Sequence, residues 1–98
     1  HATEIAIVGD RADERTLALE REVASRHLPF AVVLPVVPGD AQALLARELP
    51  WLAPMVTQSG APAAYVCTGF ACQAPTTSAA ELGRLLDLAT APPRIVLS

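Results

Sequence analysis

The sequence predicts an α/β fold, a small Rossmann-like three-layer sandwich whose elements follow the order β-α-β-α-β-β-α. Continuous apolar runs alternate with amphipathic helical patterns, as in a mainly parallel sheet with helices on both faces. Capping residues and prolines bound the helical patterns. Near the end, two short β-type runs follow each other across a glycine, which indicates a terminal antiparallel hairpin. Right-handed crossovers predict the strand order 2-1-3, with the last strand beside the third.

The chain opens with a strand and a helix. Residues 4–8 (EIAIV) form an apolar run that predicts a buried strand. Asp10 is the expected N-cap of the following helix, because its side chain can accept from the first free backbone N–H groups. Leu17, Val23, Ala24 and Leu28 form the expected apolar face of that helix, and Pro29 ends it.

The second strand and helix follow. Residues 30–37 are continuously apolar, which predicts a strand covered on both faces, and Pro35 places it at an edge or marks its end. Asp40 is the expected cap of a short helix over residues 41–48, with Leu44, Leu45 and Leu49 facing inward. Trp51 follows Pro50 and is interpreted either as a core residue or as an interface anchor, a role that tryptophan often takes.

The predicted hairpin pairs residues 63–67 with residues 70–74 through a two-residue loop at Thr68 and Gly69. Glycine supplies the positive φ that such a loop needs. In this register Cys67 lies opposite Phe70 and Tyr65 lies opposite Cys72. Side-chain alternation then places all four side chains on one face of the sheet.

This register makes Cys67 and Cys72 diagonal neighbours, roughly 7–8 Å apart. A disulfide is strained once the Cα atoms are beyond about 7 Å, so the C-x4-C spacing does not indicate a bridge. Two small buried thiols are the favoured interpretation, and a redox or metal role is the alternative. His1 and His27 add no recognisable zinc spacing, so we expect no metal site and no cofactor.

The last helix has the clearest start. Ser78 and Glu81 form an S-x-x-E capping box, in which each side chain can satisfy a free backbone N–H group. The helix is expected over residues 79–88. Its predicted apolar face consists of Leu82, Leu85, Leu86 and Ala89.

Length and composition limit the classes of function. The 98 residues predict one α/β domain, with 52% apolar residues to build its core. A net charge of −3 without any lysine argues against a nucleic-acid or anionic-membrane surface. No apolar run is long enough for a membrane span, and two cysteines fit a reducing cytoplasm. We expect a domain excised from a larger protein, with residues 1–3 as a tag remnant and residues 92–98 as a tail. Residues 94–98 (RIVLS) have two interpretations, an edge strand or part of that tail.

A resemblance to a known family rests on residues 60–82. Gly60, the run PAAYVC over residues 62–67, Phe70, the pair Cys72-Gln73, then PTT at 75–77 and the pair Glu81-Leu82 are the residues that carry it. They resemble the C-terminal end of the YyaL-type and spermatogenesis-associated thioredoxin-domain-containing proteins. The resemblance implies a parent chain with a thioredoxin-like domain, an (α/α)6 barrel similar to sugar epimerases, and a small C-terminal domain. It covers neither the thioredoxin-like domain nor the barrel, so none of their active-site residues carries over.

These observations lead to three hypotheses. The first is a non-catalytic C-terminal domain that packs against the barrel of its own polypeptide, with Trp51, Tyr65 and Phe70 as candidate interface residues; no catalytic constellation has sequence support. The second is a redox-assisting domain in which Cys67 and Cys72 act as a thiol relay for the thioredoxin-like domain. The third and weaker one is a wall of a carbohydrate-binding site in the barrel.

Overall fold

The computed structural model describes residues 3–28 and 31–90. Its elements, in chain order, are β1 (Thr3–Val8), α1 (Glu14–Ala24), β2 (Ala31–Val36), α2 (Asp40–Glu48), the 3₁₀ helix η1 (Pro50–Leu52), β3 (Ala63–Thr68), β4 (Ala71–Cys72) and α3 (Ala79–Thr90). The predicted α/β class and element order are confirmed. The expected tag remnant lies outside the described residues except for Thr3, which begins β1, and the expected tail at residues 92–98 lies outside them entirely.

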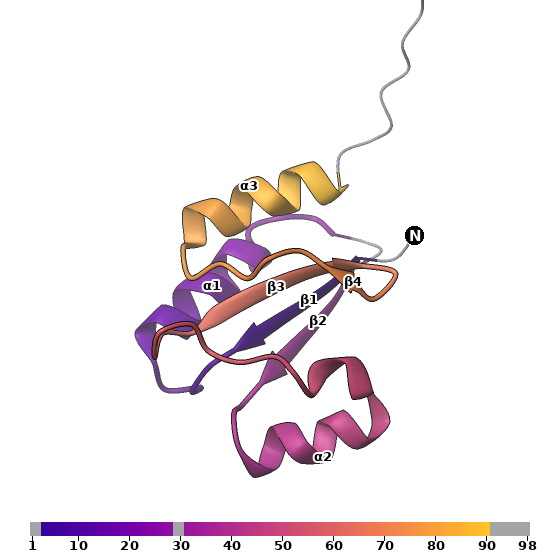
Figure 1. The fold of residues 1–98 in the computed structure, drawn as a ribbon. Coiled ribbons are helices and arrows are strands. Elements are labelled where there is room, and N and C mark those ends of the chain that lie inside the picture. The colour runs from indigo at the N-terminus through magenta and orange to yellow at the C-terminus, as the bar shows by residue number, and fades with distance from the viewer. Residues whose placement is uncertain (1–2, 29–30, 91–98) are drawn as a thin grey trace, which may run out of the picture.

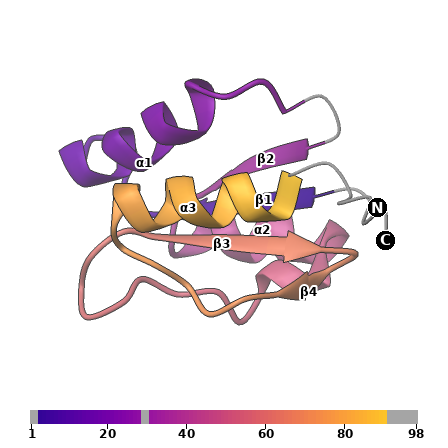
Figure 2. The same cartoon turned by 90° about the horizontal axis from the view of Figure 1, so that it is seen from above.

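Four strands form one sheet in the order β2-β1-β3-β4, which confirms the predicted 2-1-3 order with the last strand beside the third. Helices α1 and α3 cover one face, and α2 lies on the other (Figure 1). Figure 2 shows α1 and α3 lying side by side over the sheet. The fold therefore has three layers, as the alternating patterns predict.

The strand directions differ from the prediction of a mainly parallel sheet. β1 pairs with β2 in parallel, but it pairs with β3 antiparallel, so the sheet is mixed. The reason lies in the connection after η1. Residues 53–62 carry the chain back along the sheet, and β3 starts beside the end of β1, where Ala63 pairs with Val8. The chain therefore does not make the parallel crossover that the alternating pattern favours.

The core has two halves, one on each face of β1, which is buried along its whole length. Residues of β1 alternate between the two halves, as the period of a strand requires. The half under α1 and α3 contains Ile5, Ile7, Leu19, Val23, Ala64, Val66, Leu82, Leu85 and Leu86. The half facing α2 and η1 contains Ala6, Val8, Val36, Leu52, Met55, Ala63, Tyr65 and Cys67.

β2 is an edge strand, which confirms the prediction made from Pro35. The expectation that both of its faces are covered is wrong. Val32 and Val33 point to opposite faces, and their exposed fractions are 49% and 44%. For Val33 the physical reason is that α1 and α3 lie over β1 and β3, so their face of the sheet is left open at β2. Val32 lies on the opposite face, where it pairs with Glu4 across β1 and β2.

The first two helices differ from the sequence expectations in their caps. Helix α1 begins at Glu14 with Asp13 as its N-cap, and the Asp13 carboxylate accepts from the backbone N–H of Arg15. Asp10 instead accepts from the N–H of Ala12 in the preceding turn, so it is not the cap. Gly39 precedes α2 without any side-chain cap, because Asp40 is already the first helical residue.

The apolar faces of these helices are also rotated from the prediction. The buried residues of α1 are Thr16, Leu19 and Val23, whereas Leu17 is half-buried and Ala24 is exposed. In α2, Leu45 packs on the core, but Leu44 is exposed. The predicted apolar residues that lie outside the core therefore belong to the surface of the domain.

Helix α3 confirms the predicted cap. The Ser78 hydroxyl accepts from the N–H of Glu81 at 3.2 Å. The second half of the capping box does not form, because the Glu81 carboxylate pairs with Arg84. Leu82, Leu85 and Leu86 are buried as expected. In the part of the chain that the structure describes, no helix combines the length and apolar character that a membrane crossing needs.

Charged residues tie α1 to α3. The Arg26 guanidinium donates to Asp87 at 2.9 Å and to Glu22 at 2.8 Å. Its hydrogen bond holds the pKa of the Asp87 carboxyl below the ordinary value. Because the folded pKa is lowered, the stabilising interaction is present at neutral pH and is lost as the pH falls through that lowered value.

Gly9 provides a test of the packing at the end of β1. A Cβ atom at this position would lie 2.8 Å from Pro62 Cβ and would also overlap Thr16 Oγ1, both in buried residues. We expect Gly9→Ala to lower the free energy of unfolding by about 2 kcal/mol, measured by urea denaturation.

Gly83→Ala is the matched control. A Cβ atom there would meet only the ends of the Glu22 and Arg26 side chains, which can move at the cost of weakening their partly exposed ion pair. Alanine also has the higher helix propensity by about 1 kcal/mol, so the stability should stay within about 1 kcal/mol of the parent chain. Equal losses in the two variants would contradict this description of the packing.

Candidate functional site

The hairpin between β3 and β4 turns one residue later than the sequence predicts. Its two loop residues are Gly69 and Phe70, with φ angles of 56° and 68°, rather than Thr68 and Gly69. A two-residue hairpin loop whose central φ angles are both positive has the twist that matches its flanking strands. Thr68 is therefore the last residue of β3, and it pairs with Ala71. The predicted second strand over residues 70–74 is shortened to Ala71–Cys72.

This shift changes the relation between the two cysteines. Cys67 and Cys72 are directly opposed in the pairing of β3 with β4, their Cα atoms are 3.9 Å apart, and their sulfur atoms are bonded in a disulfide. The prediction of diagonal thiols without a bridge is wrong, because a shift of one residue at the turn changes every cross-strand partner. The same shift removes the predicted pairing of Tyr65 with Cys72.

The two cysteines have different environments. Cys67 is fully buried in the core half that faces α2 and η1. Cys72 is exposed on the edge strand β4, and its sulfur lies 3.9 Å from the carbonyl oxygen of Phe70. The favoured interpretation of two buried thiols is therefore wrong, because both sulfurs belong to the disulfide and only Cys67 is buried. Only one end of the disulfide lies at the surface.

Glu4 lies beside the buried end of the disulfide. It pairs with Cys67 across β1 and β3, and its exposed fraction is 4%. The Glu4 carboxylate accepts from the backbone N–H of Phe70 at 2.6 Å, a charge-assisted hydrogen bond to the tip of the hairpin. Sequence reasoning did not identify Glu4 as part of the site. The signal for it is an acid inside a strand that is otherwise apolar.

Aromatic residues surround the tip of the hairpin. Phe70 is 62% exposed, Trp51 is half-buried, and the centroids of their rings lie 5.3 Å apart. Trp51 Nε1 is buried without a hydrogen-bond partner among the described residues. Tyr65 is buried, and its hydroxyl donates to the carbonyl of Val56 and accepts from the N–H of the same residue. Among the three candidate interface residues, Phe70 thus presents the most surface.

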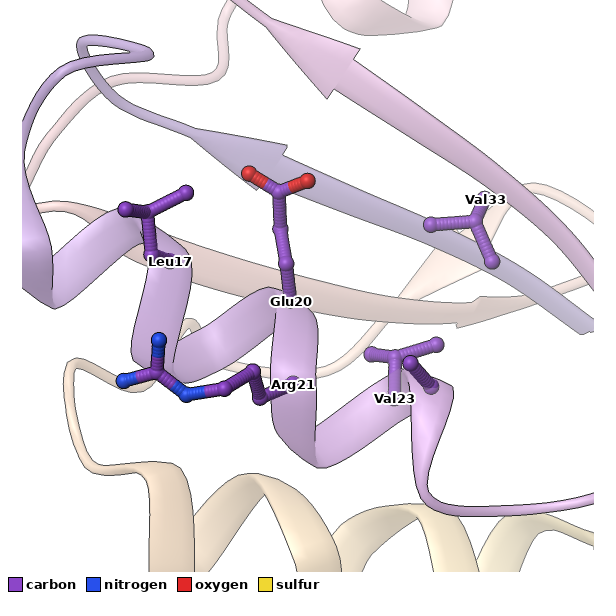
Figure 3. Close-up of a pocket in the computed structure, with 6 residues that line it drawn as sticks. Leu17, Glu20, Arg21, Val23 and Val33 are labelled. Carbon is purple, nitrogen blue, oxygen red and sulfur yellow. The ribbon is translucent and has the colours of Figure 1, made fainter.

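A second feature is a groove between α1 and β2, with a volume of about 400 Å³. Figure 3 shows Leu17 and Val23 of α1 on one side of the groove and Val33 of β2 on the other. Glu20 and Arg21 also line the groove, and Glu20 forms an ion pair with Arg11 at 2.6 Å. The groove is lined by the core residue Val23, the half-buried Leu17 and the exposed Val33.

Together these features define a small α/β domain with a surface disulfide hairpin and an apolar groove at the opposite edge of its sheet. The chain is 37% identical over 83 residues to Spermatogenesis-associated protein 20 of Homo sapiens. That match covers 85% of this chain and 10% of the human protein, so the chain is similar to one segment of a much longer protein. No family model and no solved structure matches the chain. The match supports the spermatogenesis-associated part of the resemblance, and the thioredoxin-domain part stays a prediction.

The disulfide gives a direct stability test. It closes a loop of only a few residues, so chain entropy predicts a stabilisation of about 2 kcal/mol. We expect Cys72→Ser to lose this amount relative to the oxidised chain in urea denaturation. In dithiothreitol the two proteins should have nearly equal stability, because Cys72 is exposed and serine replaces it with little loss of packing. An equal difference with and without reductant would contradict a role for the bond.

Proposed function

We propose that this chain is a non-catalytic docking domain of a larger polypeptide, which packs through the groove between α1 and β2 against another domain of the same polypeptide. The observation that carries this proposal is the exposure of Val33 on the edge strand, beside Leu17 and Val23 of α1 in one groove. Apolar surface that gathers in one place on a small domain commonly marks an interaction site.

A neighbouring domain of the same polypeptide fits the groove for two reasons. The similar human protein is about ten times longer than the matched segment, so its segment has many potential neighbours within one chain. The groove is lined mainly by aliphatic side chains, together with Glu20 and Arg21, and apolar residues are typical of the centre of an interface. It has no set of convergent polar groups of the kind that orients a small ligand, within the residues that the structure describes.

The resemblance in residues 60–82 supports the finer form of this proposal. In that form the domain is the C-terminal part of a cytoplasmic thioredoxin-domain-containing protein, and the groove packs against an (α/α)6 barrel. The sequence similarity to the human protein is consistent with a domain inside a multidomain chain. The identity of the neighbouring domain is part of the proposal.

A second candidate function is dithiol–disulfide exchange at Cys67 and Cys72. The specific observation in its favour is that the disulfide has one exposed end, on an edge strand. Bonds that are exposed tend to be the exchangeable ones, whereas structural disulfides are protected and have low reduction potentials. The two candidates use opposite edges of the sheet, so one chain can carry both.

Val33→Lys tests the docking proposal. Lysine is tolerated on edge strands, so the variant should keep its melting temperature while it places a charge in the groove. We expect its affinity for the separately expressed remainder of the polypeptide to fall at least about 10-fold in calorimetry, as for a buried interface residue. Leu44→Lys, at an exposed apolar position on α2, should bind like the parent chain. Failure of the parent chain to bind the remainder, or equal losses in both variants, would reject the proposal.

The exchange function predicts a higher reduction potential for the disulfide between Cys67 and Cys72 than a structural disulfide has. We expect a midpoint above about −300 mV, the approximate upper limit for structural disulfides of secreted proteins. It is measured by equilibrating the chain in dithiothreitol or glutathione buffers and trapping free thiols with an alkylating reagent. A midpoint well below that value would assign the bond a structural role alone.

A further inference from the structure

The two sulfur atoms of the hairpin differ in how an external thiol can approach them. Thiol–disulfide exchange begins when a thiolate attacks one sulfur of the bond, and access decides which sulfur is attacked. Cys67 has an exposed fraction of 0% and sits in the core between β1 and β4. Cys72 lies on the outermost strand and is exposed. An attacking thiolate therefore reaches Cys72, and Cys67 is the sulfur that leaves.

The hairpin is also tied to the central strand by a contact that does not depend on the disulfide. The Glu4 carboxylate on β1 accepts from the N–H of Phe70 at the tip of the loop. Phe70 has a positive φ, which is unfavourable for a bulky residue and persists only where surrounding contacts hold it. Among the described residues, the backbone N–H of Phe70 is the group that donates to the Glu4 carboxylate. This hydrogen bond thus maintains the turn whose register places Cys72 opposite Cys67.

We propose that the hairpin is an exchange site in which Cys72 receives the thiol of an external dithiol, Cys67 is the buried leaving sulfur, and Glu4 is the positioning residue that keeps the pair opposed when the bond is open. This inference rests on the second candidate function. It adds the direction of the exchange and a residue outside the cysteine pair.

The reaction balances as a two-electron exchange. A thiolate of the external dithiol forms a bond with Cys72 Sγ, the bond between Cys72 and Cys67 breaks, and its electron pair leaves on Cys67 Sγ, which takes up a proton. The second thiolate of the dithiol then attacks the dithiol sulfur that is bonded to Cys72. The mixed disulfide breaks, Cys72 leaves as a thiolate and is protonated by water. The dithiol has become a disulfide and the protein pair has become two thiols.

Single-cysteine variants of the chain test the direction, with glutathione disulfide as the probe. Cys67→Ser keeps the exposed thiol, and Cys72→Ser keeps the buried one. We expect Cys67→Ser to form the mixed disulfide with glutathione at least about 10-fold faster, because the thiol must be accessible to react. Mass spectrometry follows the reaction, and circular dichroism verifies that both variants are folded. Equal rates, or a faster reaction of Cys72→Ser, would overturn the assignment.

Variants of Glu4 test the positioning role through the equilibrium of the pair with glutathione. Glu4→Met removes the acceptor, and we expect the equilibrium constant for closing the disulfide to fall about 10-fold, the scale of one hydrogen bond to a charged group. Glu4→Gln keeps an acceptor oxygen and should stay within about 3-fold of the parent chain. Glu48→Met, on the exposed face of α2, is the matched control and should leave the constant unchanged.

The outcomes distinguish the exchange function of the cysteine pair from the positioning role of Glu4. If the parent chain does not exchange with glutathione, the exchange function itself fails, whatever Glu4 does. If the parent chain exchanges but Glu4→Met leaves the constant unchanged, or Glu4→Gln falls as far as Glu4→Met, the positioning role of Glu4 fails and the exchange function stands.

Discussion

The antiparallel pairing of β1 with β3 is the constraint on which the rest of the structure depends. β1 is buried along its whole length and contributes side chains to both halves of the core. Its register with β3 places Ile5 beside Val66 under the helices, and it places Glu4 beside Cys67 at the hairpin end. A shift of one residue in this register would move the carboxylate into the apolar half under α1 and α3.

The sequence is sufficient to predict features that depend on local chemistry. Ser78 caps α3 because a hydroxyl before an amphipathic run satisfies free N–H groups, whatever surrounds it. Pro35 correctly indicates an edge strand. The cap and the edge position need no knowledge of distant parts of the chain. The strand order also agrees with the prediction, although the parallel crossover into β3 on which that prediction rests does not form.

The candidate site depends on a choice that local chemistry leaves open. A turn with Gly69 in the first loop position requires Phe70 to adopt a positive φ, against its own preference. The Glu4 carboxylate, 66 residues earlier in the chain, supplies the hydrogen bond at that position. A pattern confined to residues 63–74 therefore gives the wrong turn, and with it the wrong partner for each cysteine. The antiparallel direction of β3 cannot be predicted from periodicity for a similar reason, because tertiary contacts determine the path of residues 53–62.

The surface of the domain also depends on how the helices pack, which local sequence patterns do not specify. Leu17 and Val33 are apolar enough to be counted as core from the sequence, yet they line a groove because the helices lie over β1 and β3. The hairpin lies at the other edge of the sheet, so a neighbour seated in the groove leaves the exposed cysteine accessible. A docking role and an exchange role are thus compatible in one small fold.

The most direct test of the register between β3 and β4 is nuclear magnetic resonance spectroscopy of the oxidised chain. Because the Cα atoms of Cys67 and Cys72 are 3.9 Å apart, their Hα protons should show a strong nuclear Overhauser effect. Cross-strand effects that instead join Cys67 to Phe70 and Tyr65 to Cys72 would contradict the register of β3 with β4, and with it the direct opposition of Cys67 and Cys72 at the site.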